Sequence, residues 1–148
     1  MRCLVTGSEK AACVEEPGGM RQPCVDDDDC YINGSLCYKG RCMCTPGLSY
    51  HKAGQACVRR CRVYGKIMSV YEELSITEHN DFVSQLTPNA KCIHKCTAEK
   101  SFLCLSVDMS SNGTTCLLSS SGYLDVSKSD RQSGDVGWLF GTRDCEYP

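Results

Sequence analysis

The alternation of apolar and polar residues is clearest in the second half of the chain. Residues 102–108 (FLCLSVD) and 114–119 (TTCLLS) alternate closely enough to predict two strands. The Asn-Gly pair at 112–113 between them favours the tight turn of a β-hairpin. Residues 62–76 mix β-branched and aromatic residues with polar ones, which predicts a strand or two, and residues 136–140 (VGWLF) predict a buried closing strand.

A helix is expected before this hairpin. Thr87 followed by Pro88 predicts an N-cap with proline in the first helical position, and residues 89–100 can then form the helix. Cys92 and Cys96 lie four residues apart and therefore on one helical face, so both sulfur atoms can point at the same neighbouring sheet.

Two more cysteines are expected on that sheet. Cys104 and Cys116 would lie on adjacent strands of the hairpin, each within reach of one helical cysteine. Two disulfides would then fasten the helix to the hairpin. The polar segment 120–134 that follows is expected to form a long loop.

The cysteine content defines the class of protein. Fourteen cysteines in 148 residues are typical of secreted scaffolds in an oxidising compartment, and the even number allows seven disulfides with no free thiol. Eight cysteines fall within residues 3–57 and six are spread over residues 61–145, which predicts two modules, residues 1–57 and 61–148.

The linker between the modules, residues 58–60, is too short to let them tumble freely. Its Arg59-Arg60 pair is compatible with a dibasic cleavage site and with an ordinary charged loop, and the second reading is the simpler one. The first seven residues lack the apolar run of a signal peptide, so the chain is expected to be a mature form or a fragment.

The first module resembles an EGF-like module over residues 24–57, and an EB-type module has similar spacing. The resemblance depends on the Cys-x-Cys pair at 42–44 and on the Pro46-Gly47 turn before Cys57. It implies an N-terminal β-hairpin knot with three disulfides, and it leaves Cys3 to pair with Cys13. The implied pairs are Cys24 with Cys37, Cys30 with Cys42, and Cys44 with Cys57.

The second module resembles the PAN/apple family over residues 61–145. The matching features are the Cys-x3-Cys pair in a helix, a cysteine in the following strand, another before Leu117, and cysteines at both ends. The resemblance implies an α+β domain with one helix packed on an antiparallel sheet, so the whole chain is expected to be a small disulfide-rich fold. The implied pairs are Cys92 with Cys116, Cys96 with Cys104, and Cys61 with Cys145.

The sequence offers little catalytic chemistry. The histidines at 51, 79 and 94 have no convergent partner, and nucleophile-elbow, zinc-protease and phosphate-loop motifs are missing from the sequence. No enzyme, catalytic residue or cofactor is therefore expected. The aspartates at 26–29 raise the possibility of calcium, but consecutive residues cannot converge on one ion, so a solvated acidic turn and no metal are expected.

Binding residues can be suggested on two elements. Lys91, Lys95 and Lys100, with His94, make the outward side of the expected helix basic, which could attract sulfated glycans or an acidic protein surface, although a solvated helix face is the simpler reading. Trp138, the single tryptophan, is expected in the core, and if partly exposed it would be a binding anchor.

Two sequons, at Asn33 and Asn112, lie in expected turns where glycans would be exposed. Charge is balanced, with eight basic and seven acidic residues in 1–60 and eight and eleven in 61–148, which argues against nucleic acid. No window approaches the roughly 18 apolar residues that cross a bilayer, so no membrane insertion is expected.

The predicted function is secreted, extracellular recognition of a protein or glycan. Two alternatives remain open: a structural subunit of a matrix or filament, which would self-associate, and an inhibitor or toxin acting on a protease or haemostatic factor.

Overall fold

The computed structural model describes residues 2–5, 11–14, 18–77, 79–85 and 87–146, the first two ranges by their backbone only. Its N-terminal part contains β1 (Arg2–Val5), β2 (Ala11–Val14), the 3₁₀ turn η1 (Asp27–Asp29), β3 (Ser35–Tyr38), β4 (Arg41–Cys44), β5 (Ser49–His51) and β6 (Ala56–Val58). Its C-terminal part contains β7 (Tyr64–Glu72), β8 (Leu74–Ile76), β9 (Phe82–Gln85), α1 (Asn89–Ala98), β10 (Ser106–Ser110), β11 (Thr115–Ser119), η2 (Tyr123–Asp125), η3 (Lys128–Asp130), β12 (Arg131–Ser133) and β13 (Trp138–Cys145).

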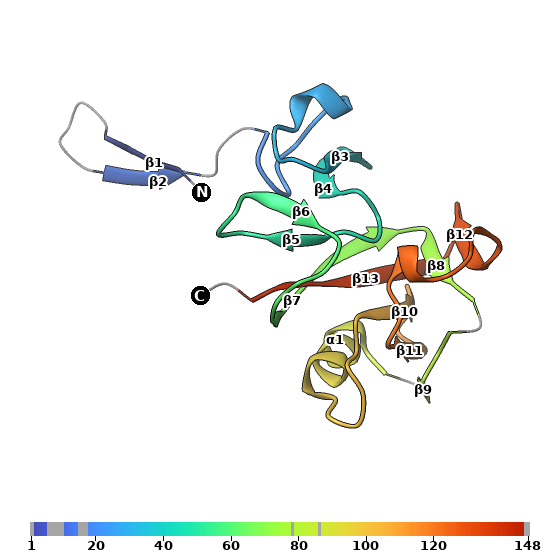
Figure 1. Cartoon of the computed structure of the whole chain (residues 1–148). Coiled ribbons are helices and arrows are strands. Elements are labelled where there is room, and N and C mark those ends of the chain that lie inside the picture. The colour runs from blue at the N-terminus through green and yellow to red at the C-terminus, as the bar shows by residue number, and fades with distance from the viewer. Residues whose placement is uncertain (1, 6–10, 15–17, 78, 86, 147–148) are drawn as a thin grey trace.

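A five-stranded antiparallel sheet organises the C-terminal part, in the order β7-β13-β10-β11-β9 (Figure 1). The last strand in the sequence therefore lies inside the sheet, and β7 and β9 are its edges. The helix α1 covers one face through contacts with β7, β10 and β11. Smaller two-stranded ladders are formed by β1-β2, β3-β4, β5-β6 and β8-β12. Among the described residues, the protein is thus a small disulfide-rich fold with one α-helix and mostly antiparallel strands.

The core between α1 and the sheet is built around cystines. Cys92 and Cys96 of α1 are fully buried together with Cys104 and Cys116, beside Val107 and other apolar side chains of the sheet. The disulfides of the described residues join Cys92 with Cys116, Cys96 with Cys104, Cys61 with Cys145, Cys24 with Cys37, Cys30 with Cys42, and Cys44 with Cys57.

These six pairings are the same as those that the two resemblances imply. The side chains of Cys3 and Cys13 lie outside the described residues, but the β1-β2 backbone ladder places the two residues opposite each other. No disulfide between described residues joins the part before residue 58 to the part after residue 60.

The other face of the sheet is covered in part by the N-terminal part. Tyr71 and Phe140, both fully buried, form an apolar cluster with Met43 of β4. The Tyr71 hydroxyl donates to the Cys44 carbonyl oxygen over 2.7 Å, and its ring packs edge-to-face on Tyr38 with centroids 5.4 Å apart. The two cysteine modules therefore share one hydrophobic core.

The Pro-Gly turn of the first module also contacts the second. Gly47 has a φ of 100°, which favours glycine, and a Cβ atom there would lie 2.2 Å from Cγ of Leu124. The chain between the parts is fixed as well, because Arg59 and Arg60 both donate to the carboxylate of Asp125. These contacts fix how the two parts are placed relative to each other.

The expected helix start was wrong in detail. Thr87 forms no cap: its hydroxyl shares a hydrogen bond of 2.7 Å with Ser84 and lies 3.2 Å from the Gln85 carbonyl oxygen. Pro88 has an extended ψ of 149° and itself precedes the first helical residue. The helix ends at Ala98 instead of Lys100.

The first hairpin strand begins at Ser106 and not at residue 102, so Cys104 lies before the strand. The Cys104 carbonyl oxygen accepts from the Arg143 guanidinium over 3.2 Å and is therefore occupied by a side chain. The polar segment 120–134 is also more regular than a loop, because it contains η2, η3 and β12, and β12 pairs with β8.

The closing strand begins later and runs further than residues 136–140. Val136 is 79% exposed in the turn before β13, where Gly134 and Gly137 have positive φ. The strand continues past Phe140 because Gly141 fits a tight site, where a Cβ atom would lie 2.8 Å from Cγ2 of Val107.

Removing the Cys61–Cys145 disulfide should lower the free energy of unfolding more than removing any other bridge of similar exposure. It spans 84 residues, whereas Cys24–Cys37 spans 13. In the chain-entropy model the long loop contributes about 4 to 5 kcal/mol and the short one about 3 kcal/mol. Denaturant unfolding of the C61A/C145A and C24A/C37A double variants measures the difference. Equal losses would contradict the loop-length argument.

Candidate functional site

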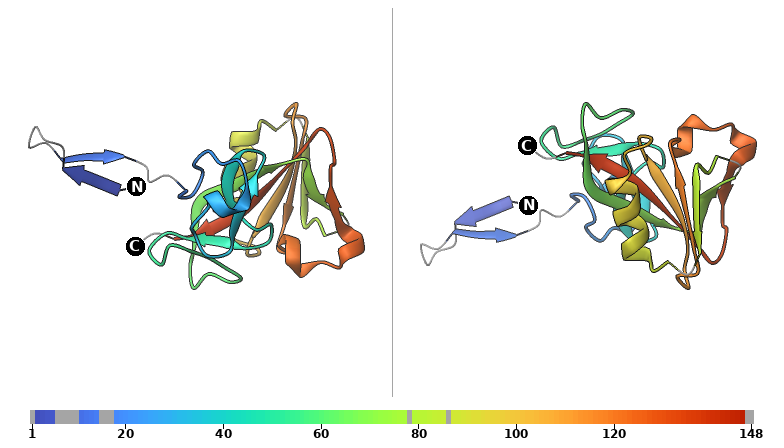
Figure 2. Two further views of the ribbon diagram at one scale, coloured as in Figure 1. Left: turned by 90° about the horizontal axis from the view of Figure 1, so that it is seen from above. Right: turned by 90° about the horizontal axis from the view of Figure 1, so that it is seen from below.

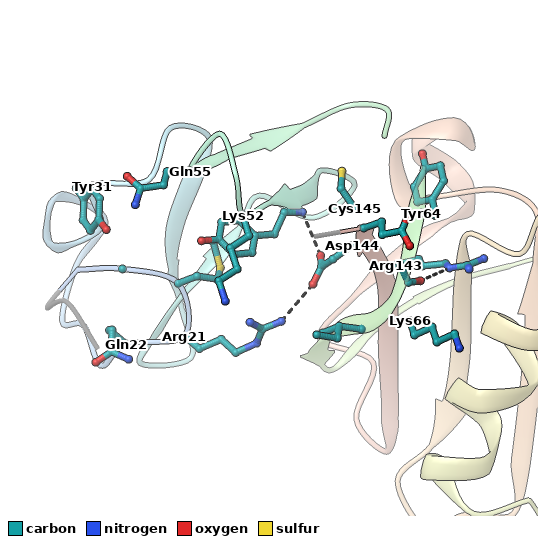
Figure 3. Close-up of a pocket in the computed structure, with 16 residues that line it drawn as sticks. Arg21, Gln22, Tyr31, Lys52, Gln55, Tyr64, Lys66, Arg143, Asp144 and Cys145 are labelled. Atoms are coloured by element: carbon teal, nitrogen blue, oxygen red, sulfur yellow. Dashed lines mark hydrogen bonds and ion pairs between the residues drawn. The ribbon is translucent and has the colours of Figure 1, made fainter. Parts of the chain in front are cut away.

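One cavity lies between the two parts of the protein, and we call it the junction pocket (Figure 3). Its volume is about 480 Å³. The N-terminal part contributes residues 19–22, Tyr31, Tyr50, Lys52 and Gln55, and the C-terminal part contributes residues 64–67 and 143–146. Both cysteine modules are therefore needed to form it.

Asp144 is the polar centre of the junction pocket. Its buried carboxylate accepts hydrogen bonds from the Tyr50 backbone N–H at 3.0 Å, from the Ser69 hydroxyl at 2.9 Å, and from the Arg21 guanidinium at 3.2 Å. Burial raises the pKa of Asp144, although these three donors favour the charged form. The carboxylate connects β5 and the segment before η1 to the interior strand β13.

The neighbouring Arg143 serves the scaffold. Its guanidinium points away from the junction pocket (Figure 3) and donates to the carbonyl oxygens of Gly65 at 2.6 Å and Cys104 at 3.2 Å. Within the described part of the chain no carboxylate forms an ion pair with it. Burial lowers the pKa of Arg143. This side chain holds the start of β7 and the segment before β10 to β13.

The walls of the pocket present aromatic and apolar side chains to solvent. Tyr31 is 48% exposed and Ile67 is 67% exposed. Tyr50, whose backbone N–H donates to Asp144, is half-buried. Lys52 and Lys66 add positive charge to the lining, and Glu146 adds negative charge. Tyrosine and arginine are enriched at binding surfaces, and both line this pocket.

The basic residues suggested from sequence lie elsewhere. Lys91, Lys95 and Lys100 belong to α1 or its end, on the sheet face that carries the cystine core, and none lines the junction pocket. The Lys95 ammonium lies 5.6 Å from the centre of the Phe82 ring and donates to the Ser84 hydroxyl. Lys91 and Lys100 are exposed. The three lysines and Trp138, which the sequence suggested as binding residues, therefore do not form one site.

Trp138 is half-buried at the start of β13 and lines a second, smaller cavity. The three histidines are dispersed: the His51 ring accepts from the Gly54 N–H, His79 lies 2.9 Å from Asp130, and His94 is exposed on α1. None of them lines the junction pocket.

The acidic run 26–29 forms a hydrogen-bonded turn. The Asp29 carboxylate accepts from the backbone N–H groups of Val25 and Asp26, which lower its pKa, and Asp27 accepts from the Cys37 N–H. These bonds give the carboxylates a structural role in η1. The nearby sulfur atoms of Cys24, Cys30 and Cys42 cluster within 4.8 Å, but each belongs to a disulfide and offers no thiolate to a metal.

Both sequons lie at exposed positions. Asn33 and Asn112 are exposed, and the Asn112 side-chain oxygen accepts from the Thr114 hydroxyl of its own sequon over 2.7 Å. Glycosylation of either residue stays a prediction.

The residues of the junction pocket were not identified from the sequence. Tyr31, Tyr50 and Ile67 stand in unremarkable contexts, and their convergence depends on contacts between distant parts of the chain. The charged pair Arg143-Asp144 inside an otherwise apolar closing strand was the one available signal.

No family model, curated protein or solved structure matches this chain. Its disulfide content is typical of extracellular proteins. Within the described ranges, no helix has both the length and the apolar character required to cross a membrane.

The ion pair between Arg21 and Asp144 should stabilise the protein in a pH-dependent way. Arg21→Gln leaves a buried carboxylate without its cation, and we expect a loss of about 1 kcal/mol at pH 8. The loss should shrink toward pH 4, because Asp144, whose pKa is raised, becomes protonated and no longer needs the cation. Urea unfolding at both pH values measures it.

Lys39→Gln is the matched control, because Lys39 pairs with Glu73 at an exposed position. This substitution should leave the free energy of unfolding nearly unchanged at either pH, because exposed ion pairs contribute little to stability. A pH-independent loss for Arg21→Gln would show that the charge of Asp144 is not what the arginine stabilises.

Proposed function

We propose that this protein is a secreted binding protein that recognises an extracellular protein or glycan in the junction pocket. The observation that carries the proposal is the exposure of Tyr31 and Ile67 on a pocket whose centre is fixed by Asp144. A rigid surface with exposed aromatic and apolar groups loses little entropy when a ligand binds.

We also propose that the chain combines an EGF-like or EB-type module with a PAN/apple-like domain. Support for the first comes from the β3-β4 and β5-β6 hairpins and from the crossed order of their cysteine pairs. Support for the second comes from one helix fastened by two cystines to an antiparallel sheet, with a third cystine joining the ends. Both families serve extracellular recognition, and that inference is an analogy.

Charge around the pocket favours a polar ligand over a purely apolar one. Lys52 and Lys66 lie on opposite parts of the protein, so a ligand with an acidic group that spans the junction can approach both. Glu146 lies on the C-terminal side and disfavours a uniformly anionic ligand there.

Self-association is a second candidate, favoured by the open edges of the sheet. The edge strand β7 exposes Ile67 and Val70, and the other edge β9 exposes Phe82 and Val83. Unprotected apolar edges can pair with other strands, as a repeating matrix or filament subunit would require.

The two candidates can be separated with one pair of variants. Ile67 and Val83 are exposed apolar residues, 67% and 54%, on opposite edge strands of one sheet, so Ile67→Glu and Val83→Glu are matched. A glycan and extracellular-protein screen on the oxidised wild-type protein supplies the ligand. We expect Ile67→Glu to weaken binding at least tenfold and Val83→Glu to leave it unchanged.

In the binding screen, equal binding by wild type and Ile67→Glu would exclude the junction pocket as the ligand site. Sedimentation of the same proteins measures self-association. Concentration-dependent assembly of the wild type that Val83→Glu abolishes, in the absence of any foreign ligand, would favour the structural role instead.

A further inference from the structure

A second cavity of about 300 Å³ lies on the sheet face opposite α1, and we call it the acidic pocket. It shares no lining residue with the junction pocket. Its lining consists of Ser75, Ile76, Thr77, Asn80, Asp108, Leu117, Asp135 and Trp138, which come from β8, the segment after it, β10, β11, the turn before β13 and the first residue of β13.

Asp108 is a buried carboxylate with too few donors. It is 2% exposed, and its strand neighbours Val107 and Met109 face the cystine core on the other side of the sheet. Both of its oxygens lie 3.3 Å from the same backbone N–H, that of Ile76, and no other described group donates to them. A carboxylate can accept about four hydrogen bonds, so most of this acceptor capacity is unused.

The other two functional residues of the acidic pocket, Asp135 and Trp138, form hydrogen bonds with neighbouring residues. The Asp135 carboxylate accepts from the Ser75 hydroxyl over 2.7 Å, and its backbone N–H donates to Glu73. The Trp138 backbone N–H donates to the Asp135 carbonyl oxygen, and the Trp138 carbonyl oxygen accepts from the Glu73 backbone N–H. The turn that ends at Trp138 is therefore tied at two points to Glu73, the residue after β7.

The acidic pocket lacks a positive charge. Two carboxylates line it, and no basic side chain does so among the residues described. Burial, helped by the negative charge of Asp135, raises the pKa of Asp108 to about 7, although the hydrogen bond from the Ile76 N–H lowers it. His79 forms its hydrogen bond with Asp130, and Lys39 forms its ion pair with Glu73, so the interactions of these two side chains are with other carboxylates.

We propose that the acidic pocket binds a basic side chain, lysine or arginine, presented by a partner protein. The ammonium or guanidinium group would lie between Asp108 and Asp135, where it supplies the missing charge and donors. The aliphatic stem would lie along the apolar part of the lining and the Trp138 ring, which attracts cations through its π face.

The shape and lining distinguish this ligand from a metal ion. The cavity is far larger than a bare cation, and the side chains of Ile76, Leu117 and Trp138 have no atom that coordinates calcium or magnesium. They do provide the apolar wall that a lysine or arginine stem needs. The proposal does not depend on the junction pocket.

Trp138 provides the measurement because it is the single tryptophan of the sequence. Nα-acetyl-arginine amide and Nα-acetyl-lysine amide are titrated into the oxidised protein at pH 8 while tryptophan emission is recorded, with neutral Nα-acetyl-norleucine amide as the matched probe. We expect a saturable change with the two cationic amides only. At pH 5.5, where Asp108 is protonated, binding should weaken at least tenfold.

Two substitutions test the roles of the carboxylates. Asp108→Asn and Asp135→Asn should each weaken binding of the cationic amides at least tenfold, while Asp28→Asn, an exposed aspartate of η1, should leave it unchanged. Asp135→Asn keeps an acceptor for Ser75 and is less buried, so it tests the site even if Asp108→Asn disturbs folding.

Three results would overturn the proposal. These are an equal response to the norleucine amide, unchanged binding by Asp135→Asn and Asp108→Asn, or a response to calcium chloride without one to the cationic amides. Ile67→Glu should bind the cationic amides normally, so failure at the acidic pocket and failure at the junction pocket are told apart.

Discussion

Burial of Tyr71 and Phe140 on the second face of the sheet is the contact on which the rest of the structure depends. A sheet whose helix covers only one face leaves the other exposed to water, and a domain of this size cannot afford that exposure. Met43 of the N-terminal part lies against these rings, and Tyr71 donates to Cys44. Two sets of cystines, each closed within its own part, are therefore joined by a hydrophobic cluster and form a single folded body (Figure 2).

The buried carboxylates of Asp108 and Asp144 show two solutions to one problem. Both lie on the face that the helix does not cover, and burial raises the pKa of each. Asp144 receives hydrogen bonds from a backbone amide, a hydroxyl and a guanidinium, and these bonds offset the free energy of burying its charge. The two oxygens of Asp108 share a single donor, the Ile76 N–H. Asp144 is therefore satisfied by the fold itself, whereas Asp108 keeps the unused acceptor capacity on which the proposed binding of a basic side chain depends.

Sequence reasoning found the features that depend on neighbouring residues and on cysteine spacing. The hairpin around residues 112–113 and the helix that carries Cys92 follow from local pattern, and both are present. The start of the strand at Ser106 could not be predicted, because Arg143 occupies the Cys104 carbonyl from 39 residues away. The junction pocket depends on still longer contacts, such as that between Arg21 and Asp144, 123 residues apart, for which the sequence has no periodic signal.

The position of β13 sets an order of events during biosynthesis. The strand lies between β7 and β10, so their backbone groups on that side have no partner until residues 138–145 have left the ribosome. The same residues deliver Asp144, which Tyr50 and Arg21 need, and Cys145, which Cys61 needs. A nascent chain of this protein therefore keeps a gap in its sheet, and Cys61 lacks its native partner, until residues 138–145 have been synthesised.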